Sequence, residues 1–267
     1  MDVILLGRNS LYKANLFIVI FCLFFVPFSI GKEITISAGI FMGIIETNGS
    51  GPYQLILKEA AKRSGIEYSE QVYPLQRAIK TFTARKALAI YGMTEAVISE
   101  IGEEKILTSY PLGIYKVHIF TKKGEPVISN FKQLENKVVG GINGYQQYYQ
   151  ELTKNKVKIS YFTHEHSQMD RLNLGRIDTI VGFLPDWLEH SDTLDYDPKF
   201  PIYVGYDYMT VWNTPQGQDF VNKISFALQS MKSDGSLKKI LGDRYMEFDY
   251  TPTRQFEWTP KAEATFQ

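Results

Sequence analysis

The residues whose types and spacing could hold a charged small molecule begin with the segment 141–145, which reads GINGY. It joins an expected strand to an expected helix, and a helix N-terminus carries free N–H groups and a positive dipole end that attract anions such as a carboxylate. Asn143, Gly144 and Tyr145 are therefore candidate ligand contacts. An ordinary strand-to-helix loop is the alternative interpretation of the same residues.

Two other sequence patterns are weaker indications of a functional site. His164 and His166 would face one side of a strand, but no further Cys or His lies nearby in the sequence to complete a metal site. Asn48, Gly49 and Ser50 match a glycosylation acceptor, although next to another glycine they favour a turn. The sequence has no phosphate-binding glycine loop, no Ser/His/Asp order and no nucleophile elbow. It therefore predicts no metal, no cofactor and no catalytic residue.

Composition excludes several classes of protein. The 267 residues include 29 Lys and Arg against 29 Asp and Glu, with 44% apolar and 22% charged residues, which is unlike a disordered or collagen-like chain. A nucleic-acid partner is disfavoured, because duplex affinity depends on clustered Lys and Arg and the sequence has no such cluster. The length fits one large domain or two small ones.

The first 31 residues are typical of a secretory signal peptide. Arg8 and Lys13 form a positive region, residues 16–28 are an uncharged and mostly apolar run, and residues 29–31 (SIG) end in the small residues that precede a cleavage site. We expect cleavage after residue 31 and export to the periplasm.

A retained membrane anchor is the alternative interpretation of this segment. Crossing the hydrocarbon takes roughly 20 apolar residues, and Pro27 arrives before that length is reached. Cys22 is the only cysteine and would leave with the signal, so the exported chain would form no disulfide. A chain of this length can be stable on its hydrophobic core alone.

Strands and helices alternate along the rest of the chain. Strands are expected at 33–38, 66–73, 87–92, 115–121, 138–142, 157–163, 177–183 and 202–212, and helices at 52–64, 75–84, 130–136, 145–153, 167–175, 216–232 and 237–241. Such alternation favours parallel pairing, because parallel strands need a helical crossover. The first series ends near Gly113 and a second begins, which implies two lobes with a sheet each.

Several short motifs follow one another in a specific order. They are GMT at 92–94, TSYP at 108–111, NFKQLENKVVG at 130–140, LGRIDTIV at 174–181 and MKSDGSLKKI at 231–240. In order and spacing they resemble the bacterial extracellular solute-binding proteins of family 3, the periplasmic receptors typical of amino-acid ABC transporters. The resemblance covers nearly all of residues 33–246.

The resemblance implies an α/β fold, the two-lobed clamshell of the type II periplasmic binding proteins. Each lobe would be a mainly parallel sheet flanked by helices, and the chain would cross twice between lobes. Residues 32–111 and 208–250 would form lobe 1, residues 115–204 lobe 2, and residues 251–267 a tail. The ligand would bind between the lobes, where strand ends and a domain interface also favour a pocket on physical grounds.

The resemblance also places particular residues at this cleft. Met93 and Thr94 would meet the ligand, with a strand-ending turn as the alternative. Phe41, Phe183 and Trp187 could form apolar walls, although an aromatic residue near a strand end often belongs to the core.

Two departures from the family pattern affect the expected ligand. Family members that bind amino acids commonly carry an arginine after the GMT motif that grips the ligand carboxylate, but residues 95–104 here read EAVISEIGEE. The acidic residue that pairs with the ligand ammonium is also replaced, in the segment 182–185 (GFLP). Ordinary amino-acid binding is therefore disfavoured. Arg77 is a candidate replacement anion anchor, with a solvated helix arginine as the alternative.

The leading hypothesis is a monomeric, non-catalytic periplasmic receptor that hands a small polar solute to an ABC permease or reports it to a membrane sensor. One alternative is a clamshell-fold lyase or dehydratase acting on a small organic acid, which would need a cleft carboxylate of raised pKa and a cationic partner. Another is a signalling partner that has lost ligand binding, in which side chains would fill the cleft.

Overall fold

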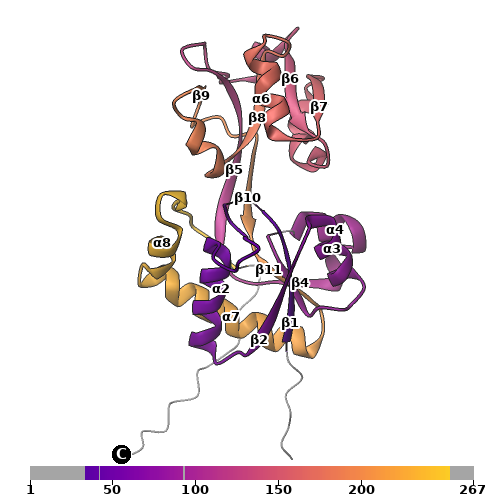
Figure 1. Cartoon of the computed structure of the whole chain (residues 1–267), viewed down its shortest axis with the longest axis vertical. Coiled ribbons are helices and arrows are strands. Elements are labelled where there is room, and N and C mark those ends of the chain that lie inside the picture. The colour runs from indigo at the N-terminus through magenta and orange to yellow at the C-terminus, as the bar shows by residue number, and fades with distance from the viewer. Residues whose placement is uncertain (1–33, 42, 93, 253–267) are drawn as a thin grey trace, which may run out of the picture. The chain divides into compact units, whose positions relative to one another are not determined.

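The computed structural model describes residues 34–41, 43–92 and 94–252, so the expected signal peptide at 1–31 lies outside the described residues, as does most of the expected tail. The described chain forms two β-sheets, each flanked by helices (Figure 1). None of the described helices is long and apolar enough to cross a membrane.

The first sheet has five strands in the order β2-β1-β3-β11-β4. Their bounds are β1 Ile34–Gly39, β2 Tyr68–Tyr73, β3 Ala89–Tyr91, β4 Ile106–Thr108 and β11 Met209–Trp212. β1 pairs in parallel with β2 and β3, whereas β11 is antiparallel to β3 and β4.

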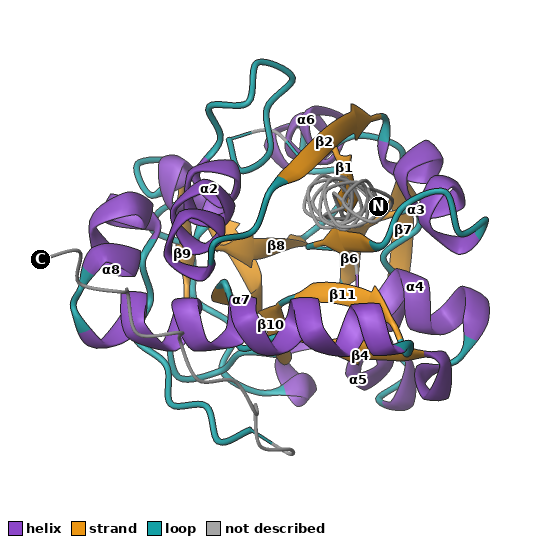
Figure 2. Cartoon of the chain, turned by 90° about the horizontal axis from the view of Figure 1, so that it is seen from below, coloured by secondary structure: helices purple, strands orange, loops and turns teal. Residues whose placement is uncertain are grey.

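Helices cover both faces of the first sheet. They are α2 Pro52–Ser64, α3 Leu75–Thr83, α4 Thr94–Ile101, α7 Pro215–Ser233 and α8 Ser236–Leu241. Figures 1 and 2 show α7 running along the sheet next to β11. Ile36, Val211 and Phe220 belong to the core under α2, α7 and α8, while Phe82 and Trp212 belong to a second core under α3 and α4. Burying apolar residues on both faces is what fixes the sheet between two helical layers.

The second sheet has the strand order β10-β5-β8-β6-β7, with β9 beside β5. Its strands are β5 Gly113–Lys122, β6 Val138–Ile142, β7 Lys158–Phe162, β8 Thr179–Leu184, β9 Leu194–Tyr196 and β10 Tyr203–Asp207. Two α-helices accompany them, α5 Gln150–Lys154 and α6 Glu165–Asn173. The short 3₁₀ helices of the chain are η1 Glu103–Lys105, η2 Phe131–Leu134, η3 Gln146–Tyr149, η4 Asp186–His190 and η5 Gly242–Arg244.

Both sheets are mixed, so the expectation of mainly parallel sheets is wrong in this respect. In the second sheet β6 is parallel to β7 and β8, but β5 is antiparallel to β8, β9 and β10. The expected strand 202–212 is two strands, β10 in the second sheet and β11 in the first. A strand that enters a sheet directly from the other sheet needs no helical crossover, so it can pair antiparallel.

The chain passes between the sheets twice, from β4 to β5 and from β10 to β11, as expected. The lobe limits at 32–111 with 208–250 and at 115–204 stay predictions, and β10 continues beyond residue 204 to Asp207.

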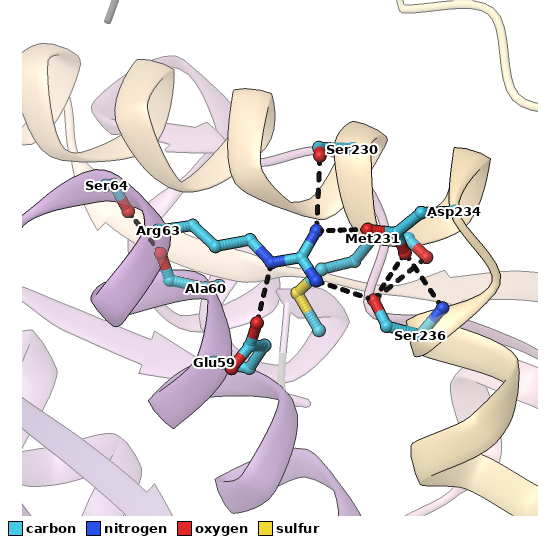
Figure 3. Close-up of polar contacts among 8 residues, drawn as sticks. All are labelled: Glu59, Ala60, Arg63, Ser64, Ser230, Met231, Asp234 and Ser236. Carbon is cyan, nitrogen blue, oxygen red and sulfur yellow. Dashed lines mark hydrogen bonds and ion pairs between the residues drawn. The ribbon is translucent and has the colours of Figure 1, made fainter. Parts of the chain in front are cut away.

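Arg63 joins α2 to the turn between α7 and α8 (Figure 3). Its Nε donates to Glu59 over 2.8 Å, and its Nη1 donates to Asp234 over 2.6 Å and to Ser230 over 3.2 Å. Its Nη2 donates to the Ser236 hydroxyl over 3.0 Å. Hydrogen bonds from Ser236 and Arg63 lower the pKa of Asp234 to about 2. One guanidinium therefore fixes three helices beside the first sheet.

Candidate functional site

A cavity of about 260 Å³ is lined by residues that flank both sheets. The loop after β1, α2 and α3 contribute from the first sheet, and the segment after β6 and the end of β8 contribute from the second. Sites for drug-sized ligands measure roughly 300–1,000 Å³, so this cavity suits a smaller solute.

Five residues that the sequence singled out line this cavity. They are Phe41, Asn143, Gly144, Tyr145 and Phe183. The structure brings them together from three places in the sequence, because the loop after β1, the segment after β6 and the strand β8 all end here. Trp187, in contrast, is buried in the core of the second sheet.

Arg77 does not line the cavity. Leu75, Gln76 and Ile79 face it from α3, whereas Arg77 is exposed and its guanidinium lies 4.8 Å from the centre of the Tyr73 ring. Side chains at successive helix positions point about 100° apart, which turns Arg77 away from the face of α3 that reaches the cavity. The structure therefore does not bring this expected anion anchor to the site.

Thr94 is buried at the first position of α4 and is also absent from the cavity lining. Its hydroxyl shares a hydrogen bond of 2.7 Å with the hydroxyl of Thr210 on β11. Thr94 therefore fixes the start of α4 against the sheet. Met93, expected beside it, lies outside the described residues.

Residues 142–145 of the segment 141–145 line the cavity, but N–H groups of this segment already donate hydrogen bonds within the protein. The expected helix 145–153 is a 3₁₀ turn, η3, followed by the short helix α5. The Gly144 N–H donates to the Gln146 side chain over 2.9 Å, and the Tyr145 N–H donates to the Ile142 carbonyl over 3.2 Å. These two N–H groups already have acceptors and therefore offer little to an anion, and the expected carboxylate site stays a prediction.

Asp207, which the sequence analysis missed, lies at the end of β10 and lines the cavity. The Tyr53 hydroxyl donates to its Oδ2 over 2.5 Å. Burial raises the pKa of Asp207 to about 7 despite this hydrogen bond. A single acidic residue in the otherwise apolar and aromatic stretch 202–212 was a signal that could have drawn attention to it.

Asp186, which begins η4 after β8, is a second carboxylate in the lining. It pairs with Arg244 of η5, whose Nη1 donates to its Oδ1. Burial raises the pKa of Asp186 to about 6, although Arg244 acts in the opposite direction. Gly43, with φ of +77°, leaves room for the Arg244 guanidinium, which any side chain at that position would meet.

Aromatic rings form the wall on the side of the second sheet. The Phe183 ring lies 5.3 Å from Tyr145 and 5.2 Å from Tyr148, and Tyr148 lies 5.8 Å from Tyr115, all edge to face. The Tyr115 hydroxyl donates to Glu95 Oε1 of α4 over 2.9 Å. Burial raises the pKa of Tyr115 and Tyr148, so both phenols stay neutral.

A buried polar network holds the loop between β1 and α2 in place. Gln54 accepts hydrogen bonds from the N–H groups of Glu46 and Gly51 over 2.9 and 3.0 Å, and donates to Glu70 over 2.8 Å. The Tyr91 hydroxyl donates to the same Glu70 carboxylate. This loop carries several cavity residues, so the network positions one wall of the site.

No group of three or more His, Cys, Asp or Glu side chains in the described part of the chain is placed to hold a metal ion. His164 and His166 stack with ring centres 5.3 Å apart at the start of α6, rather than on a strand.

Two mixed sheets joined by two crossings, with a cavity lined from both, define the two-lobed fold of the type II periplasmic binding proteins, and the predicted fold class is confirmed. No family model matches the chain, and no curated protein matches it in sequence.

Solved structures match it over most of its length. The second substrate-binding domain of a putative amino acid ABC transporter from Streptococcus pneumoniae is 22% identical, with a TM-score of 0.58 over 80% of this chain and 100% of that one. The GluR0 ligand-binding core from Nostoc punctiforme, in complex with L-glutamate, is 16% identical, with a TM-score of 0.62 over 79% and 99%. A probable amino-acid ABC transporter extracellular-binding protein from Bacillus subtilis is 18% identical, with a TM-score of 0.63 over 79% and 97%.

Proposed function

We propose that this chain is an exported solute-binding protein that takes up a small organic molecule between its two lobes, for delivery to an ABC permease or for detection by a membrane sensor. The observation that carries the proposal is the cavity of about 260 Å³, to which elements of both sheets contribute, in a fold shared with transporter-binding domains. A ligand that contacts both lobes favours the arrangement in which both contacts are made.

The proposed ligand contacts differ in part from those expected from the sequence. Phe41, Asn143, Gly144, Tyr145 and Phe183 keep this role. To them we add the further lining residues Tyr53, Tyr115, Tyr148, Asp186 and Asp207. We assign Thr94 to positioning α4, and we give Arg77 no ligand contact.

A binding protein accounts for the site better than the two alternatives. A lyase or dehydratase would use a carboxylate of raised pKa with a free cation beside the substrate. Asp186 and Asp207 meet the first condition, but Arg244 is ion-paired with Asp186 and is not part of the lining. A partner that has lost its ligand would have a filled cleft, unlike the cavity described here.

Export is part of the proposal and rests on the pattern of residues 1–31. Expression of the full chain in a bacterium, followed by fractionation and N-terminal sequencing, should recover a periplasmic protein that begins at Lys32. A protein retaining residues 1–31 in the membrane fraction would contradict export with cleavage.

Thermal unfolding of the exported chain with a panel of amines, amino acids, sugars and organic acids tests the binding function. A true ligand at 100 times its Kd raises the free energy of unfolding by about 2.7 kcal/mol, which is a shift of several degrees in Tm. Each stabilising compound should be recovered unchanged after incubation. Turnover of that compound would instead support the enzyme.

A further inference from the structure

We propose that the solute is a small organic cation without a carboxylate, held between Asp207, Asp186 and the faces of the surrounding tyrosine and phenylalanine rings. The inference rests on the proposed function, because it specifies the ligand chemistry of the same cavity. Four features of the described residues lead to it.

The first feature is the sign of the charge. Asp186 and Asp207 are the acidic residues of the described lining, and that lining contains no Lys, Arg or His. Glu95 accepts a hydrogen bond from the Tyr115 hydroxyl of the lining, and its negative charge helps to raise the pKa of Asp207. A cation entering such a site is attracted and an anion is repelled, and low solvent exposure strengthens both effects.

The second feature is that Asp207 has no positive partner among the described residues. The Tyr53 hydroxyl donates to it, but no described basic side chain lies within ion-pair distance, whereas Asp186 has Arg244. Burial therefore raises the pKa of Asp207, as expected for a carboxylate removed from water without a counter-ion. A ligand ammonium would supply the missing partner.

The third feature is the aromatic wall. Tyr115, Tyr145, Tyr148 and Phe183 contact one another edge to face, so their orientations are set before any ligand arrives. Ring faces attract ammonium groups, most strongly where water is excluded. Rings and carboxylates together suit a cation with an apolar body.

The fourth feature is that the described lining offers a ligand carboxylate no basic side chain. Arg244 pairs with Asp186, the Gly144 N–H donates to Gln146, and Arg77 lies outside the lining. An amino acid would place its ammonium well but leave its carboxylate unpaired near two aspartates. An amine that lacks the carboxylate avoids this cost.

Matched probe pairs test the ligand class by calorimetry and thermal shift on the exported chain at pH 8. Isoamylamine and L-leucine differ by the carboxylate alone, and choline and 3,3-dimethyl-1-butanol share a shape but differ in charge. Isoamylamine should bind at least about tenfold more tightly than L-leucine, and choline should bind at least about tenfold more tightly than the neutral alcohol.

Variants test the assigned residues. Asp207→Asn should weaken amine binding at least about tenfold while keeping an acceptor for the Tyr53 hydroxyl, and Tyr148→Leu should weaken it without changing charge. Asp219→Asn, on the exposed face of α7, is the matched control and should bind amines as the unaltered protein does.

The pH dependence gives an independent readout. Burial raises the pKa of Asp207 to about 7 and of Asp186 to about 6, so both ionise as the pH rises from 5 to 8. Tyr53, Glu95, Asp186 and Arg244 are the titratable and charged groups that act on Asp207 and its Tyr53 partner. Affinity for an amine should therefore increase with pH over this range, and less so in Asp207→Asn.

Failure of this inference can be separated from failure of the proposed function. Tighter binding of L-leucine than of isoamylamine, or of the neutral alcohol than of choline, would overturn the cation assignment and leave a solute-binding protein. Unchanged amine affinity in a folded Asp207→Asn would also overturn it. If no probe and no member of the wider panel binds, the proposed function fails and this inference with it.

Discussion

At the scale of single residues, Asp207 should lower the stability of the ligand-free protein at alkaline pH. Its pKa in the folded chain, about 7, lies above the ordinary value of 3.8, so between these values the folded state holds a proton that the unfolded state has lost. The free energy of unfolding therefore falls as the pH rises through this window. Asp207→Asn removes the effect. At pH 8 it should raise the free energy of unfolding by on the order of 1–3 kcal/mol, which raises Tm by several degrees.

Thermal unfolding at pH 8 and pH 4.5 checks this expectation, because the gain should nearly vanish at the lower pH. Asp219→Asn changes the same chemical group at an exposed position and should move Tm little at either pH. Equal effects of the two substitutions at pH 8 would contradict the account of Asp207.

The sequence predicted some residues of the site and not others for a physical reason. Phe183 lies near the end of one expected strand and the segment 141–145 at the end of another, so their place at a sheet edge could be expected. Tyr53 and Asp207 lie 154 positions apart in sequence, and their hydrogen bond exists only after the chain has crossed into the second sheet and completed β10. Local pattern carries no information about such a pair.

At the scale of elements, the contacts of Arg63 should contribute measurably to stability. Three of the four hydrogen bonds from this guanidinium connect α2 with α7, α8 and the turn between them (Figure 3), and the Arg63 side chain is 25% exposed. Allowing for solvent screening, Arg63→Ala should cost about 1–2 kcal/mol, or roughly 2–8 °C in Tm. Urea unfolding at pH 7 measures it.

Two comparisons sharpen this measurement. Lys223→Ala removes an ordinary i, i+4 pair with Asp219 on α7 and should cost less than about 0.5 kcal/mol. Ser236 and Arg63 lower the pKa of Asp234. The contribution of that carboxylate to the free energy of unfolding is therefore present above its ordinary pKa and is lost as the pH falls towards about 2. A penalty for Arg63→Ala that grows on acidification would contradict the assignment.

Gln54 should act on ligand binding without touching the ligand. Its side chain holds the N–H groups of Glu46 and Gly51 and so fixes the loop that contributes Phe41 to the cavity. Gln54→Ala should weaken binding of any ligand of the site severalfold, and it should lower Tm by a few degrees because buried N–H groups lose their acceptor.

The comparison for Gln54→Ala is Gln218→Ala, which removes a side-chain hydrogen bond within α7. Gln218→Ala should leave affinity unchanged. Equal affinities of Gln54→Ala and the unaltered protein would show that the loop is held by other contacts.

Element prediction succeeded where the helix signals are local. The bounds of α2 are those expected from Pro52 at the start and Gly65 at the end, where Gly65 takes the left-handed conformation. The helix α4 was missed, although Val97 is fully buried, because an eight-residue helix between a glycine loop and an acidic stretch has little periodicity to detect. The break between β10 and β11 was missed because one apolar run serves two sheets.

At the scale of the whole molecule, His118 on one side and the cavity carboxylates Asp207 and Asp186 on the other should give opposite pH dependences of stability that partly cancel. His118 of β5 is buried against Tyr196, and burial lowers its pKa to about 4 from the ordinary 6.5. Lys116 and Asp197 act on it in opposite directions and more weakly than burial. Between pH 6.5 and 4 the unfolded state therefore binds a proton that the folded state does not, so His118 lowers stability as the pH falls.

Asp207 and Asp186 act in the opposite direction in the same pH range, since for each of them the folded state holds a proton that the unfolded state has lost. With two such carboxylates against one imidazole, the free energy of unfolding of the unaltered protein should rise on acidification from pH 6.5 to 4.5. Relative to the unaltered protein, His118→Gln should increase this gain and Asp207→Asn should reduce it, each by at most about 1.4 kcal/mol per pH unit. Urea unfolding at four pH values measures these slopes.

The double variant completes the test. The two residues belong to separate surroundings, His118 on β5 of the second sheet and Asp207 at the cavity, so their effects should add and the double variant should return to the slope of the unaltered protein. A shared slope in all four proteins would mean that other titrating groups dominate. If each single variant tilts the pH profile in its own direction and the double variant restores it, then Asp207 carries a cost that a cationic ligand is well placed to relieve.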